Sequence, residues 1–83
     1  MSGRAYRVQF SNVARATVAA LPPDVRSRFD TGIKMLAADP YGAGSKPIKE
    51  PDYRQALVGG CITSYYVSTT VEVVSVTRVQ GPP

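Results

Sequence analysis

The sequence has no histidine and one cysteine, and these absences remove much of the usual chemistry of small enzymes. Without histidine there is no Ser-His-Asp triad, no imidazole ligand for zinc and no imidazole general base. A lone cysteine excludes an intrachain disulfide, as is usual in a reducing cytoplasm, and Cys61 is expected to be a small buried side chain. Neither a Walker loop nor a GxGxxG motif is present. Any chemistry must therefore use Lys, Arg, Tyr or a carboxylate, and we expect no metal and no cofactor.

Long apolar runs and acidic residues are also scarce. No apolar run approaches the roughly 20 residues of a membrane span, and the opening residues lack the apolar core of a signal peptide. We therefore expect a soluble cytoplasmic protein with no membrane partner. Six acidic residues stand against ten basic ones, which gives a net charge of +4. This charge suits an anionic partner such as nucleic acid or an acidic protein, although a plain solvated surface explains it equally well.

The length and balance of the chain indicate one small globular domain, residues 1–83, without internal repeats. Hydrophobic residues make up 43% and charged residues 19%, which is a globular balance and not a disordered one. A domain of this size buries only about 60–65% of its unfolded surface. A binding partner is therefore expected to add stability.

Strands are predicted where β-branched and aromatic residues recur. Residues 5–10 alternate between apolar and polar side chains, which is typical of a half-buried strand. After residue 52, a Gly-Gly pair and a Ser-Thr-Thr run act as turns between three further runs of Val, Ile, Thr and Tyr. Residues 40–52 hold three prolines and two glycines, so we expect a surface loop there. The three later strands are predicted at 53–58, 61–67 and 71–79.

Two helices are predicted between the first strand and this loop, at 12–20 and 23–37. The second has an apolar stripe at helical spacing, and it is expected to pack on the first strand and on alternate residues of the later ones. The stripe consists of Val25, Phe29, Ile33 and Leu36. The fold class is therefore α+β, in the order β-α-α-β-β-β, with a helical hairpin on one face of a four-stranded, mainly antiparallel sheet. The opposite face is left open to a partner or substrate.

Three blocks of the sequence, in order and nearly over its whole length, resemble the RelE/ParE superfamily of bacterial toxins. The blocks read AYRVQFSNVARATVAALPPDV, IKMLAADPYGAGSKPIKEPDYRQALVGG and SYYVSTTVEVVSVTRV. The resemblance implies the toxin of a toxin–antitoxin pair, silenced by a cognate antitoxin whose extended segment wraps it. RelE-like members cleave mRNA in the ribosomal A site, whereas ParE-like members inhibit DNA gyrase.

Our first interpretation is a RelE-like, ribosome-dependent endoribonuclease, an mRNA interferase that inhibits translation, with the ribosome and mRNA as partners. A second is a non-enzymatic inhibitor of gyrase, and a third is a degenerate toxin that only binds its antitoxin. A homodimer and a toxin–antitoxin hetero-oligomer both remain open. An acidic antitoxin encoded next to this protein would identify the system.

The resemblance also implies a set of catalytic residues, namely Lys46, Lys49, Arg54 and Arg78. We expect these cations to form one cluster around a scissile phosphate, with a lysine as base and the arginines as phosphate clamps. The family often has an arginine where this chain has Ile62, and this difference favours the two non-catalytic alternatives.

Three further residues are expected to bind RNA: Tyr53, Tyr66 and Arg7. Tyrosine rings can stack on unpaired bases, and arginine can contact the RNA backbone. Tyr65 and Tyr66 are neighbours in a strand, so at most one of them lies on the open face. Ordinary roles remain open as well, because loop lysines and strand-end arginines are commonly solvated.

Overall fold

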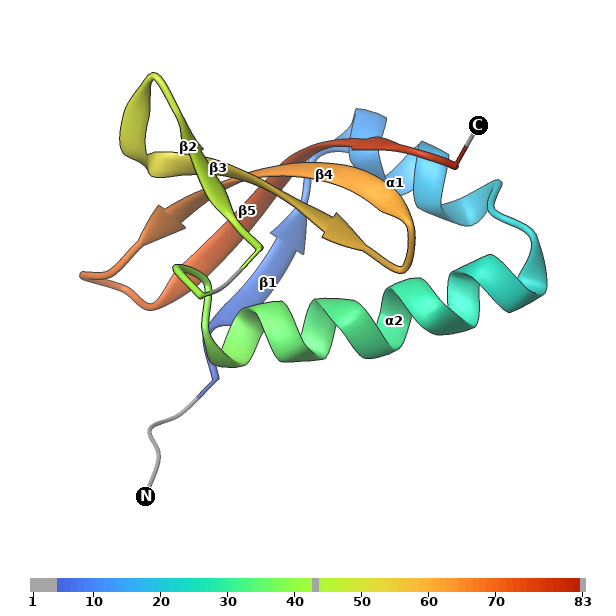
Figure 1. Cartoon of the computed structure of the whole chain (residues 1–83), viewed down its shortest axis with the longest axis horizontal. Helices are drawn as coiled ribbons and strands as arrows, with labels where there is room; N and C mark the ends of the chain where they lie inside the picture. Colours follow the sequence, from blue (N-terminus) through green and yellow to red (C-terminus); the bar gives the residue numbers. More distant parts are fainter. Residues whose placement is uncertain (1–4, 43, 83) are drawn as a thin grey trace.

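In the computed structural model, which describes residues 5–42 and 44–82, two helices pack on one face of a five-stranded mixed sheet (Figure 1). The helical hairpin and the α+β class are therefore confirmed. The order is β-α-α-β-β-β-β, with one strand more than predicted. The elements are β1 (Arg7–Phe10), α1 (Asn12–Ala19), α2 (Pro23–Ala38), β2 (Lys46–Ile48), β3 (Glu50–Val58), β4 (Cys61–Ser68) and β5 (Val73–Gln80).

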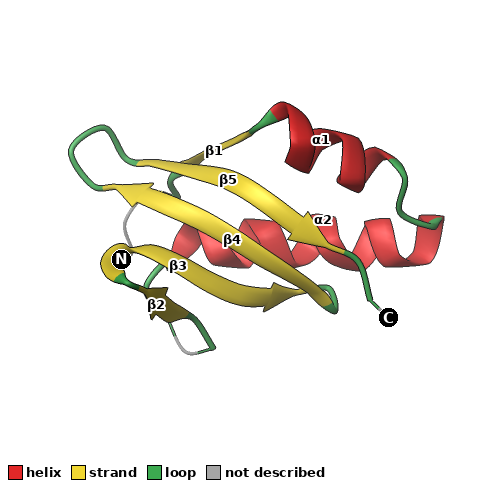
Figure 2. Ribbon diagram, turned by 90° about the horizontal axis from the view of Figure 1, so that it is seen from above, coloured by secondary structure: helices red, strands yellow, loops and turns green. Residues whose placement is uncertain are grey.

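The sheet has the strand order β1-β5-β4-β3-β2, so the first and last strands of the chain are neighbours (Figure 2). β1 runs parallel to β5, and every other neighbouring pair is antiparallel. The helical hairpin leads the chain from β1 across one face to the far edge, where β2 and β3 begin (Figure 1). None of the helices among the described residues is both long and apolar enough to cross a bilayer.

Local signals set the helix ends. Ser11 caps α1, since its hydroxyl oxygen accepts a hydrogen bond from the Ala14 amide at 3.0 Å. α2 begins at Pro23, whose fixed φ suits a first helical turn, and it ends before the Asp39-Pro40 pair. The predicted helix limits agree with the observed ones to within one residue.

The core lies between α2 and the sheet, as the apolar stripe predicts. Val25, Phe29 and Leu36 are buried, and Ile33 is partly buried against the same cluster. The turn after β3 approaches α2 so closely that a Cβ on Gly59 would lie 2.5 Å from the backbone nitrogen of Phe29. Glycine is needed there for that reason and for its φ of 59°.

Residues 40–52 are not the continuous loop that the prolines suggest. They contain β2, and β3 already begins at Glu50. Lys46 pairs with Gln55, and Pro47 pairs with Arg54. β2 is the last strand of the sheet, and an edge strand tolerates proline because one side of its backbone needs no partner.

Candidate functional site on the open sheet face

The face of the sheet opposite the helices, called the open face below, is defined by the register of the strands. Along β4 the buried side chains of Thr63, Tyr65 and Val67 alternate with Ile62 and Tyr66, which are 40% exposed. Tyr65 lies on the helix side, where its hydroxyl donates to the Pro40 carbonyl at 2.7 Å. Tyr66 therefore lies on the open face, as the alternation of the strand predicts.

One row of paired residues crosses four strands of the open face and carries a cation at each end. Lys46 pairs with Gln55, Gln55 with Ser64, and Ser64 with Arg78. Neighbouring strands lie about 4.8 Å apart, so the backbones of Lys46 and Arg78 are separated by about 14 Å. Their long side chains can both approach an anion that is bound over the middle of the row.

Arg78 reaches this face only because β5 contains a β-bulge. Tyr65 pairs with Val76, but the next pair is Ser64 with Arg78, so Thr77 is an extra residue in β5. If Thr77 paired with Ser64 in a regular register, Arg78 would lie opposite Thr63, on the helix side. The bulge moves the Arg78 side chain to the open face. Two hydrogen bonds stabilise the bulge at Thr77: Ser11 Oγ donates to the Thr77 carbonyl at 3.0 Å, and Thr77 Oγ1 donates to the Ser64 carbonyl at 3.3 Å.

A second row, one step along the strands, is aromatic. Tyr53 pairs with Tyr66, and their rings are stacked with centroids 5.6 Å apart and planes 29° apart. The Tyr53 hydroxyl lies 3.3 Å from Thr77 Oγ1, so its side chain extends across β4 towards the bulge. Arg7 belongs to the same face by its pairing with Val73, at the β1 edge. The three residues predicted to bind RNA thus share the open face.

Glu50 also reaches this row, although no pattern in the sequence points to it. The Tyr66 hydroxyl donates to Glu50 Oε1 at 2.5 Å. This hydrogen bond raises the pKa of Tyr66, with smaller contributions from burial and from the charges of Glu50 and Asp52. Glu50 lies opposite Ile48, next to an irregularity in the β2–β3 pairing, and no local pattern signals its contact with Tyr66.

Arg54 lies on the opposite side of the sheet, because it pairs with the buried Tyr65. Its guanidinium group donates from Nη1 to the Pro51 carbonyl at 2.9 Å and from Nε to Ser45 Oγ at 3.1 Å. The same group lies 5.1 Å from the centre of the Tyr41 ring. These contacts fasten the segment before β2 to the start of β3.

The structure therefore divides the four predicted cations and does not gather them into one cluster. Lys46 and Arg78 share the row on the open face, whereas Arg54 points to the helix side because alternate residues of β3 face opposite ways. Lys49 is exposed in the turn between β2 and β3, with a φ of 66°. It lies at the sheet edge and outside the row.

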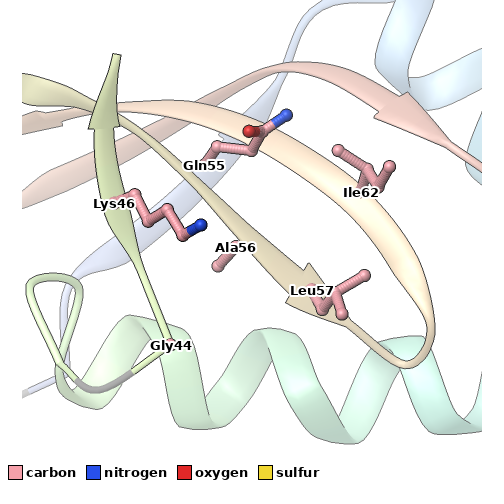
Figure 3. Close-up of a pocket in the computed structure, with 6 residues that line it drawn as sticks. All are labelled: Gly44, Lys46, Gln55, Ala56, Leu57 and Ile62. Carbon is pink, nitrogen blue, oxygen red and sulfur yellow. The ribbon is translucent and has the colours of Figure 1, made fainter.

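The end of the open face next to this row is apolar. Leu57 is 71% exposed and pairs with Ile62. Together with Lys46 and Gln55 they line a hollow of about 340 Å³ (Figure 3), to which Gly44 and Ala56 also contribute. Ile62 stands where the toxins that the sequence resembles often have an arginine, and it adds no phosphate-binding group here.

The open face offers a defined set of chemical groups. Two cations can hold a phosphate, stacked tyrosines can hold a base, and the Glu50 carboxylate can accept a proton. Among the described residues, no three His, Cys, Asp or Glu side chains come close enough together to hold a metal ion.

Comparison with known proteins identifies solved structures that have a similar fold. No protein-family model and no curated protein matches the sequence. Among solved structures, the isolated E. coli RelE toxin superposes with a TM-score of 0.82 at 22% identity, covering 95% of this chain and 86% of that one. The RelBE2 toxin–antitoxin complex of Mycobacterium tuberculosis gives 0.77 at 22% identity, with 94% and 99% covered.

An archaeal RelE–RelB complex, from Pyrococcus horikoshii, gives a TM-score of 0.76 at 18% identity and covers 94% of this chain and 96% of that one. The matches therefore extend over nearly the full length of all three chains. At these identities the likeness concerns the fold. The chain has the RelE fold, and the resemblance seen in its sequence is confirmed at that level.

Proposed function

We propose that this protein is the toxin of a toxin–antitoxin pair and acts in the cytoplasm. Its RelE fold supports this, since the similar structures include an isolated RelE toxin and two complexes with antitoxin partners. The net charge of +4 favours an acidic antitoxin. Co-expression with the neighbouring reading frame and affinity capture test the pair, and recovery of this protein alone would count against it.

The activity that we propose for this toxin is ribosome-dependent cleavage of mRNA. The observation that carries the proposal is the row from Lys46 to Arg78, next to the stacked pair of Tyr53 and Tyr66, on the sheet face opposite α1 and α2. In this proposal Lys46 and Arg78 hold the scissile phosphate, and the tyrosines stack on an unpaired base. Arg7 contacts the RNA backbone from the β1 edge.

Lys49 and Arg54 take supporting roles in this proposal. Lys49 is an exposed charge at the sheet edge and meets the RNA backbone from the β2–β3 turn. Arg54 keeps the segment before β2 in place through Ser45 and Pro51, and so holds Lys46 on the open face.

Replacement of Arg78 tests the activity directly. Removing one preorganised donor to the developing charge costs about 10²–10³-fold in rate, so Arg78→Ala is expected to reduce cleavage by that factor. Arg78 is exposed, and the variant should melt like the wild type. Induced expression followed by mapping of mRNA 5′ ends measures the loss, with Arg15→Ala on α1 as the matched control. Equal cleavage by Arg78→Ala and the wild type would contradict the proposal.

A second candidate is a non-enzymatic toxin, either one that inhibits gyrase or a degenerate one that only binds its antitoxin. Two observations favour it: Leu57 and Ile62 make one end of the open face apolar, and Arg54 points away from that face. Growth arrest without new mRNA ends, together with loss of DNA supercoiling, would support gyrase inhibition. Antitoxin binding without growth arrest would support the degenerate form.

A further inference from the structure

The hydrogen bond between Glu50 and Tyr66 places a carboxylate on the open face, beside the groups assigned to RNA. Tyr66 donates to Glu50 Oε1 at 2.5 Å while its ring is stacked on Tyr53. The phenol and the carboxylate therefore lie within the aromatic row, with the ring of Tyr66 40% exposed.

Arg78 lies next to this pair. Ser64 is the partner of Arg78, and Tyr66 follows Ser64 by two residues on the same face, so Tyr66 and Arg78 are diagonal neighbours. Such neighbours lie about 7–8 Å apart along the sheet, within reach of long side chains. Tyr53 also extends towards Arg78, because its hydroxyl lies 3.3 Å from Oγ1 of Thr77, the residue before Arg78. A carboxylate, two phenols and a guanidinium group thus lie on the open face, with Glu50 bonded to Tyr66 and Arg78 diagonal to Tyr66.

Cleavage of RNA by its own 2′-hydroxyl needs an acceptor for the hydroxyl proton. An acceptor needs a free electron pair on an oxygen or nitrogen atom. A guanidinium group stays protonated and cannot accept. The Glu50 carboxylate does have free electron pairs, and it is the group bonded to Tyr66 that is suited to the task.

We propose that Glu50, acting through the Tyr66 hydroxyl, accepts the 2′-hydroxyl proton of single-stranded RNA, an inference that rests on the proposed function. The Tyr66 oxygen takes the proton of the 2′-hydroxyl as its own proton passes to Glu50. The 2′-oxygen forms a bond to phosphorus, and the bond between phosphorus and the 5′-oxygen breaks. The 5′-oxygen takes a proton from water, and the products carry a 2′,3′-cyclic phosphate and a 5′-hydroxyl.

The electrostatic setting of Tyr66 agrees with this role. The hydrogen bond to Glu50 raises the pKa of Tyr66, so the phenol keeps its proton and stays bonded to the carboxylate near neutral pH. Asp52 adds to the same effect through its charge. Two cations belong to the same region of the sheet: Lys49 precedes Glu50 in the chain, and Arg78 is the diagonal neighbour of Tyr66.

The test measures the rate of mRNA cleavage on purified ribosomes for the wild type and for Glu50→Gln and Tyr66→Phe. Loss of a general base costs about 10²–10⁴-fold, and Glu50→Gln is expected to lose that much while its melting temperature is unchanged. Asp30→Asn is the matched control, because Asp30 is exposed on α2, on the other side of the sheet, and accepts from Arg26; this variant should cleave nearly as well as the wild type. The double variant should lose no more than Glu50→Gln, since the two groups act as one unit.

Two further readouts separate proton transfer from a merely structural role. The wild-type rate should fall as the carboxylate becomes protonated at acid pH, and the residual rate of Glu50→Gln should not show this fall. Glu50→Asp, which keeps the carboxylate, should recover part of the activity. If Glu50→Gln fails to fold, Tyr66→Phe decides the question, because it keeps the stacked ring and removes only the hydroxyl.

The outcomes distinguish this inference from the proposed function. A Glu50→Gln or Tyr66→Phe protein that cleaves at the wild-type rate overturns the inference and leaves the endonuclease proposal standing. A wild-type protein that never cleaves mRNA on the ribosome overturns both.

Discussion

Replacing Arg54 by alanine should destabilise the domain, because the contacts of this side chain are structural. Its guanidinium group makes two short hydrogen bonds, to the Pro51 carbonyl at 2.9 Å and to Ser45 Oγ at 3.1 Å. It also lies over the Tyr41 ring at 5.1 Å. A net hydrogen bond contributes about 1 kcal/mol, and an exposed cation–π contact about 0.5–1 kcal/mol. The Arg54 side chain is only half-buried, so each hydrogen bond is counted at its net value of about 1 kcal/mol. The expected loss in the free energy of unfolding is therefore about 2–3 kcal/mol.

Thermal melting followed by circular dichroism measures this loss. In a domain of this size, 1 kcal/mol shifts Tm by about 4–8 °C, so Arg54→Ala should melt roughly 10–20 °C below the wild type. Arg54→Lys keeps the charge but not the forked geometry, and it should lose most of the same stability. Ser45→Ala removes one partner, and its effect should overlap with that of Arg54→Ala in a double-mutant cycle.

A different role for Arg54 would give a different result. If Arg54 contacted the scissile phosphate directly, Arg54→Ala would cleave mRNA much more slowly while melting like the wild type. An unchanged melting temperature, or fully additive effects of Arg54→Ala and Ser45→Ala, would refute the reasoning from these contacts.

The other predictions concern the core and one titrating group. Phe29 is fully buried, so Phe29→Ala should lower the free energy of unfolding, measured with urea, by about 3–5 kcal/mol. This is a large part of the roughly 4–12 kcal/mol expected for a domain of this size. Val13→Ala, at an exposed position, should change little, and equal urea midpoints for the two variants would mean that the core is misidentified. The hydrogen bond from Tyr41 to Asp52 raises the pKa of Tyr41 to about 12, so the Tyr41 phenolate should appear late in an absorbance titration, and Asp52→Asn should bring its pKa back towards the ordinary value of about 10. Because the raised pKa belongs to the folded state, this hydrogen bond stabilises the fold fully below pH 10 and loses its effect as the pH rises to about 12. Identical titrations of the wild type and Asp52→Asn would exclude the bond.

The sequence by itself determined the elements that depend on local period. The stripe of Val25, Phe29 and Leu36 specified the buried face of α2, because residues three and four apart share one side of a helix. The alternation in β4 placed Tyr65 inside and Tyr66 outside for the same kind of reason. These patterns are written in consecutive residues, and no distant partner is needed to interpret them.

Only the tertiary structure decided which side chains meet on the open face. The bulge at Thr77 turns Arg78 onto that face, the pairing of β2 brings Lys46 into the same row, and Arg54 is sent to the other side. Two consecutive polar residues in β5, Thr77 and Arg78, are the one local sign of the bulge. The contact of Glu50 with Tyr66 joins two residues that are 16 positions apart in the chain, and no local pattern signals it. Register is set by pairing between distant segments, and a shift of one residue moves a side chain from one face to the other, so the composition of the site was fixed by the fold.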